Sequence, residues 1–126
     1  IALPEDGPAI HARYYGTFPR KIRRYALDRD VISVEFAVKA QTSLPAQIIG
    51  LRNRGLLREG FVADVVVMDL DRVRDMADFT NPHQYAQGIE YVLVNGDFAV
   101  DGEGNLTRLL RGVVITPAAG RAPVSQ

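Results

Sequence analysis

The hydrophobic period of this chain changes once, between Gly50 and Gly60, and this change limits the folds open to it. Before it, apolar residues recur at the 3.6-residue spacing of helices. After it, short runs rich in Val and Ile alternate with turn residues. Helices and strands that are segregated in this way predict an α+β arrangement, or parts of two domains, and not an alternating α/β fold. The chain has 126 residues, of which 47% are hydrophobic, so it is one domain or a piece of a larger one.

Three helices are predicted in the first half, each from a capping residue. Thr17, Ser33 and Ser43 have side chains that accept hydrogen bonds from the first backbone N–H groups of a helix. Residues 1–16 lack any period and are interrupted by Pro and Gly, so we expect a loop there. The predicted helices cover residues 18–28, 34–42 and 45–50.

About four strands are predicted in the second half. The firmest sign is Asn95-Gly96, because both residues tolerate a positive φ and this pair favours the type I′ turn of a two-residue hairpin. Residues 71–88 show no period, and we expect irregular structure there. The predicted strands cover residues 63–68, 89–94, 98–100 and 112–116.

Charge and composition exclude several classes of protein. Fifteen basic residues balance fifteen acidic ones, which argues against nucleic acid or a membrane surface as a partner, since both attract a basic face. The chain contains no Cys, so it has neither disulfides nor thiolate metal ligands. No 18-residue apolar run and no leader pattern are present, and we expect a cytoplasmic protein.

Few residues suggest chemistry by their spacing alone. His11 and His83 are the two histidines, and neither lies in a zinc-binding spacing, so the simplest interpretation is a loop histidine bonded to the backbone. Asp64, Asp69 and Asp71 flank a predicted strand, and we expect them to be turn and edge residues and not an acid–base pair.

Arg13 is a stronger candidate for a binding role. It lies between His11 and Tyr14 in the expected loop, away from the basic face of the first helix. A planar guanidinium can bind a carboxylate through two parallel hydrogen bonds, and neighbouring aromatic rings can form the wall of such a pocket. The alternative is a surface arginine that stacks on a tyrosine.

Three stretches of the chain resemble motifs of one enzyme family. "HARYYGTFPRKIRRY", "TSLPAQIIGLRNRGLLREGFVADVVVMDLDRV" and "NPHQYAQGIEYVLVNGDFAV" are similar, in this order, to segments of N-acyl-D-amino-acid deacylases. These enzymes form the D-aminoacylase branch of the amidohydrolase superfamily. The resemblance extends to about Val114 and so covers nearly the whole chain.

The resemblance implies a place for this chain in a larger fold. Members of the family have a (β/α)₈ barrel with a metal site and a small β-sandwich built from both chain termini. Residues 1–52 would be the end of the barrel, comprising the loop after strand eight and the closing helices. Residues 53–126 would be the C-terminal strands of the sandwich, so the chain would be a C-terminal fragment of a parent protein.

The resemblance also implies an activity, the zinc-dependent cleavage of N-acyl-D-amino acids to a D-amino acid and a carboxylate. Arg13 aligns with the arginine that pairs with the substrate α-carboxylate, His11 would support the loop, and Tyr14 would border the substrate. Asp6-Gly7 matches the family's Ser-Asp-Gly poorly, so the catalytic Asp and the zinc ligands are expected before Ile1. We therefore expect no catalytic residue and no bound metal in this chain, which alone would be inactive.

Other interpretations remain open at this point. The parent could be another amidohydrolase, such as a dihydroorotase-like or hydantoinase-like cyclic-amide hydrolase, although "YGTFPR" is not expected there. The chain could also be a non-catalytic, stand-alone α+β module. The D-amino acid, the acyl group and the oligomeric state are not determined by the sequence, although apolar helix faces without a barrel favour self-association.

Overall fold

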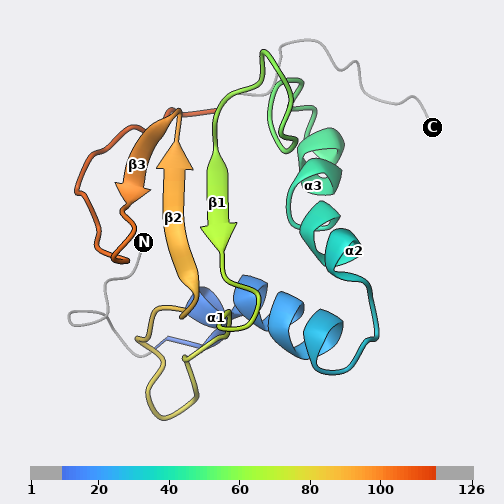
Figure 1. Ribbon diagram of the computed structural model, residues 1–126, viewed down its shortest axis with the longest axis vertical. Helices are drawn as coiled ribbons and strands as arrows, with labels where there is room; N and C mark the ends of the chain where they lie inside the picture. Colours follow the sequence, from blue (N-terminus) through green and yellow to red (C-terminus); the bar gives the residue numbers. More distant parts are fainter. Residues whose placement is uncertain (1–9, 116–126) are drawn as a thin grey trace.

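A computed structural model describes residues 10–115 and shows helices followed by a small sheet (Figure 1). This order confirms the predicted segregation of helices and strands. The helical segments are α1 (Arg13–Arg20), η1 (Lys21–Leu27), α2 (Val34–Lys39) and α3 (Ser43–Ile48). The strands are β1 (Val65–Met68), β2 (Ile89–Val94) and β3 (Asp97–Val100).

The first helix begins four residues before Thr17, so the predicted N-cap is wrong. The predicted loop is wrong for residues 13–16 and correct for residues 10–12, while residues 1–9 lie outside the described part. The Thr17 hydroxyl donates to the Arg13 carbonyl at 2.6 Å, one turn back within the helix. Pro19 consequently lies inside α1, where it has no N–H to donate. The helix then widens into the π-helical turns of η1, and the Asp28 N–H bonds to the Arg23 carbonyl at 2.9 Å.

The second and third helices are close to their predicted positions. The Ser33 hydroxyl accepts a hydrogen bond from the Phe36 N–H at 3.1 Å, which confirms Ser33 as the N-cap of α2. In α3, by contrast, Ser43 is the first helical residue and is buried, so its predicted role as the N-cap is wrong and Thr42 occupies that position. Gly50 follows the helix with φ +79°, which confirms the predicted end.

The sheet is antiparallel with the strand order β1-β2-β3. Asn95 and Gly96 join β2 to β3 with φ values of +52° and +86°, so the predicted hairpin is confirmed. The predicted last strand is wrong for residues 112–115, which lie outside any strand, and residue 116 is outside the described part. Val114 is 93% exposed there, and no strand within the described residues pairs with this segment, so its apolar sequence alone does not produce a strand.

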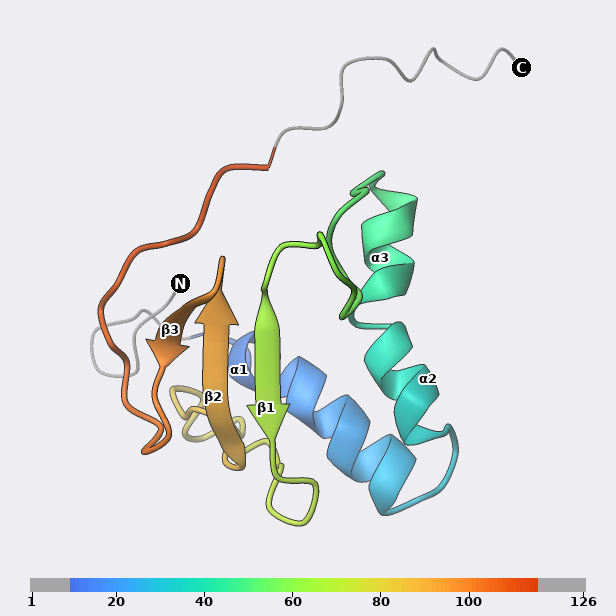
Figure 2. The same ribbon diagram turned by 45° about the horizontal axis from the view of Figure 1, so that its top comes forward.

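The helices and the sheet share one small core. Ile22 and Ala26 of η1 and Ala37 of α2 are buried together with Val73 of the β1–β2 connection, and partly buried Met68 and other apolar residues pack against them. α2 and α3 lie beside β1, and α1 begins behind the sheet near β2 (Figures 1 and 2). Many large apolar side chains nevertheless remain exposed, among them Phe18, Ile48 and Leu57.

No helix within residues 10–115 is both long and apolar enough to span a membrane.

Candidate functional site

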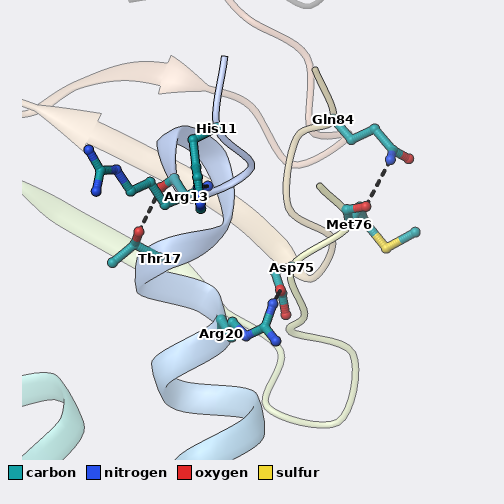
Figure 3. Close-up of polar contacts among 7 residues, drawn as sticks. All are labelled: His11, Arg13, Thr17, Arg20, Asp75, Met76 and Gln84. Atoms are coloured by element: carbon teal, nitrogen blue, oxygen red, sulfur yellow. Dashed lines mark hydrogen bonds and ion pairs between the residues drawn. The ribbon is translucent and has the colours of Figure 1, made fainter. Parts of the chain in front are cut away.

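The three predicted site residues, His11, Arg13 and Tyr14, lie together at the start of α1. All three are exposed, and Arg13 is the first residue of the helix. Figure 3 shows its side chain extending away from the connection that carries Asp75 and Gln84. The guanidinium is therefore available to a ligand that approaches this end of the helix.

The backbone N–H groups near Arg13 are already used within the turn. The Arg13 N–H donates to Nδ1 of His11 at 3.1 Å, and the Tyr14 N–H donates to the His11 carbonyl at 3.0 Å. The Gly16 N–H bonds to the Ala12 carbonyl, also at 3.0 Å. The interpretation of His11 as a loop histidine bonded to the backbone is thus confirmed. An anion bound here would be held by the Arg13 side chain and not by free helix N–H groups.

Ala12 stands where the related motif has proline. Its φ is −50°, close to the value of about −65° that a proline ring imposes. A proline at this position would therefore fit the backbone of the turn.

A loop in the β1–β2 connection supports the turn that carries Arg13. This loop, residues 75–85, lies beside the start of α1 in both ribbon views (Figures 1 and 2). Arg20 Nη1 donates to Asp75 Oδ2 at 3.3 Å (Figure 3). Just before α1, the His11 ring contacts the Phe79 ring edge-on, with 5.2 Å between the ring centroids.

Tyr15 joins the same two segments on the buried side of α1. Its ring makes edge contacts with Tyr85, at 5.5 Å between centroids, and with His83, at 6.0 Å. Partial desolvation, with a smaller contribution from Tyr85, raises the pKa of the Tyr15 phenol. The first and third motifs of the sequence are therefore in direct contact, which their separation along the chain did not reveal.

An apolar cavity within the described residues lies away from the three predicted site residues. It has a volume of about 360 Å³ and lies between the helices and the sheet, and its lining does not include His11, Arg13 or Tyr14. The lining comes from α1 and η1, from the end of α2, from the sheet and from the β1–β2 connection. It is almost entirely apolar, so the cavity continues the core and has no groups for acid–base chemistry.

The aspartates beside β1 are turn residues, as predicted. Asp64 Oδ1 accepts from the Asn95 N–H at 3.0 Å, and the Asp64 carboxylate also pairs with Arg54. Asp69 Oδ1 accepts from the Asp71 N–H at 2.9 Å. The contribution of Arg54 was missed from the sequence, because only the fold brings it to the hairpin turn.

A metal site was expected outside this chain. Within residues 10–115, no group of three or more His, Asp or Glu side chains is placed to hold a metal ion. The zinc that the family resemblance implies would therefore be held by other residues of the parent protein.

Comparison with known proteins supplies the family. The model of the amidohydrolase family matches residues 3–100. The chain belongs to the amidohydrolase family. An N-acyl-D-glutamate deacylase of Alcaligenes xylosoxydans xylosoxydans is 45% identical over 94 residues, which are 75% of this chain and 19% of that protein. The predicted similarity to N-acyl-D-amino-acid deacylases is confirmed.

Solved structures agree with this amidohydrolase assignment. A D-aminoacylase D366A mutant in complex with CuCl2 superposes with a TM-score of 0.80 at 38% identity, covering 83% of this chain and 22% of that one. An N-acyl-D-glutamate deacylase from Bordetella bronchiseptica, complexed with zinc and a phosphonate inhibitor, gives a TM-score of 0.69 at 38% identity, covering 81% and 22%. The chain thus spans about a fifth of the length of the relatives it matches.

Proposed function

We propose that this chain is the C-terminal part of a zinc-dependent hydrolase that cleaves N-acyl-D-amino acids into a D-amino acid and a carboxylate. Its similarity to proteins named as deacylases of this kind supports the proposal. In this proposal residues 1–52 close the (β/α)₈ barrel of the parent protein, and residues 53–126 contribute the C-terminal strands of its β-sandwich. The parent is cytoplasmic.

Arg13 binds the α-carboxylate of the substrate. The observation that carries this role is its position at the start of α1, where the nearby N–H groups are taken and the guanidinium is exposed. Two parallel N–H···O bonds from a guanidinium fix both the place and the rotation of a carboxylate. Held in this way, the neighbouring amide has a defined orientation for attack by water.

His11 and Tyr14 have secondary roles in this proposal. His11 fixes the backbone of Arg13 through its Nδ1, and Tyr14, which is 67% exposed, borders the bound substrate. The attacking water, the base and the metal ligands come from the rest of the parent protein. Zinc held by those residues would polarise the amide carbonyl. The isolated chain is inactive with or without added zinc.

The carboxylate role is tested by replacing Arg13 in the parent protein. We expect Arg13→Ala to lower kcat/KM about 100-fold for an N-acyl-D-amino acid, because a charged, bidentate contact is lost. The methyl ester of the same substrate lacks the carboxylate and should be hydrolysed at nearly the same rate by both proteins. Arg13→Lys should recover part of the loss, since it restores the charge without the two parallel bonds.

The matched control is Arg29→Ala, which removes an exposed arginine beyond the end of η1. It should leave both substrates unaffected. An equal loss on the acid and the ester in Arg13→Ala would contradict the carboxylate role. Hydrolysis by the isolated 126-residue chain would contradict the proposal that the catalytic groups lie elsewhere.

A further inference from the structure

We propose that the 75–85 loop is a positioning element that sets the orientation of Arg13 toward the substrate carboxylate, a role that rests on the function proposed for Arg13. The loop contacts this part of the chain at three points, from His11 just before α1 to Arg20 at its end. These contacts are Phe79 with His11, Tyr85 and His83 with Tyr15, and Asp75 with Arg20.

The contact at Asp75 combines an ion pair with close packing against the helix backbone. Its side chain is only 18% exposed, and it accepts the hydrogen bond from Arg20. Gly16 lies directly against it, and a Cβ on Gly16 would come within 3.2 Å of the Asp75 Cβ. The helix backbone and the loop are therefore in close contact here, and a side chain at position 16 would require Asp75 to shift.

The loop is itself held in shape by internal hydrogen bonds. Asp78 Oδ1 accepts from the N–H groups of Thr80 and Asn81 at 2.8 and 2.6 Å. Gln84 Nε2 donates to the carbonyls of Met76 and Asn81, both at 2.8 Å. At the base, Arg74 and Gln87 form an antiparallel bridge. These hydrogen bonds restrict the conformation of the loop. A loop restricted in this way can hold the helix that packs against it in one position.

The loop acts through Arg13 and does not itself touch the carboxylate. The Arg13 side chain extends away from Asp75 and Gln84 (Figure 3). The loop therefore packs against one side of α1, and Arg13 projects from the other. One side is fixed by the loop, and the other presents the guanidinium. Loosening the loop should weaken binding of the carboxylate without removing any group that contacts it.

The experiment uses the parent protein and two substitutions at opposite ends of the loop. Asp75→Asn removes the charge that holds Arg20, and Tyr85→Leu removes the ring that contacts Tyr15. Each should raise KM for the N-acyl-D-amino acid about three- to tenfold, leave kcat nearly unchanged and leave the methyl ester unaffected. Hydrogen exchange of the peptide covering residues 11–20 should become faster in both variants.

The control is Glu90→Gln. It breaks the ion pair between Arg72 Nη1 and Glu90 Oε1, which are 3.2 Å apart, and this pair does not include any residue of the 11–20 segment. It should change neither KM nor the exchange of residues 11–20. The Arg13→Ala protein serves as the reference for a selective loss on the acid.

The outcomes separate this inference from the proposed function. If Arg13→Ala is selective for the acid but Asp75→Asn and Tyr85→Leu leave its KM unchanged, or weaken acid and ester equally, the positioning role is wrong. Unchanged exchange of residues 11–20 in both variants would also overturn it. If the parent hydrolyses neither substrate, or if Arg13→Ala is not selective, the proposed function is wrong, and the role given to the loop is wrong with it.

Discussion

Asp64 shows how a single residue can connect segments that are distant in sequence. Its carboxylate accepts from the Asn95 N–H in the hairpin turn and pairs with Arg54, whose side chain is only 15% exposed. Arg54 Nη2 also donates to Asn95 Oδ1 at 3.4 Å. The hairpin turn is thus fixed to the segment that precedes β1, and Asp64 is a structural residue in spite of its carboxylate.

Replacing Asp64 should therefore lower stability and leave catalysis intact. We expect Asp64→Ala to lower the free energy of unfolding by about 1.5–2 kcal/mol, because a charge-assisted hydrogen bond is lost and the largely buried Arg54 guanidinium loses its carboxylate partner. The measurement is a urea unfolding curve. Asp97→Asn is the control, since Asp97 pairs with Arg111 in a half-exposed ion pair at 3.2 Å and should cost less than about 0.5 kcal/mol. Equal costs would contradict this account.

Asp78 gives a prediction about pH. Hydrogen bonds from the backbone of Asn81, then from the side chain and backbone of Thr80, lower the pKa of Asp78 below its ordinary value of 3.8. A lowered folded-state pKa adds stability above the ordinary value, and this stability is lost as the pH falls through the folded-state pKa. The 75–85 loop should therefore loosen in acid.

The test compares the urea midpoint of the wild-type protein with that of Asp78→Asn at several pH values. The wild type should be more stable at pH 6, and the difference between the two proteins should shrink below about pH 4, as Asp78 is protonated. A difference that stays constant or grows on acidification would contradict the assigned hydrogen bonds.

At the scale of the elements, local sequence signals located most helices and strands but not the start of α1. Ser33, Gly50 and Asn95-Gly96 act through their own side chains or backbone angles, so each could be recognised from its residue type. At the start of α1, the N-cap residue Ala12 makes no side-chain cap bond, and the Arg13 N–H donates to the His11 imidazole, which is not a typical capping group. Thr17 has a typical capping side chain, but it lies one turn after the first residue of α1.

The cap of α2 offers a direct test of such signals. α2 has six residues, so one cap is a large part of its local stability. Ser33→Ala should lower the free energy of unfolding by about 1 kcal/mol, measured by urea unfolding, because the Phe36 N–H loses its acceptor. Ser33→Asp keeps an acceptor at this place and should retain nearly full stability. An alanine variant as stable as the aspartate variant would contradict the cap.

The predicted last strand is wrong at residues 112–115 for a reason that belongs to the whole molecule. An apolar, β-branched run forms a strand only where a neighbouring strand can pair with it, and no sequence pattern shows whether that neighbour is present. The contact between Tyr15 and the 75–85 loop was unpredictable for the same reason. Arg13 was a candidate from its residue type and its neighbours, and the family resemblance supplied the role expected of it. The support of this segment by the loop became visible only in the structure.

The surface of the whole chain carries many large apolar side chains. Phe18, Ile48, Leu57 and Phe79 are each more than 60% exposed, and β1 adds Val66 at 49%. Exposed apolar area on this scale is usually covered by another surface. In the parent protein, the rest of the polypeptide would provide that surface.

We therefore expect the isolated chain to self-associate. Light scattering after gel filtration at tens of micromolar should show species larger than the 13.9 kDa monomer. Substituting charged residues at Ile48 and Leu57 should shift the distribution toward the monomer, while a charge added at the already exposed polar position Thr80 should not. A wild-type chain that is monomeric at these concentrations would contradict the expectation that these apolar side chains drive self-association.

The most direct test of the central claim is a crystal structure of the parent protein with a bound N-acyl-D-amino acid or an inert analogue. The account predicts two hydrogen bonds of about 2.8 Å from the Arg13 guanidinium to the α-carboxylate of the ligand. A carboxylate held by other residues, with Arg13 directed into solvent, would contradict it.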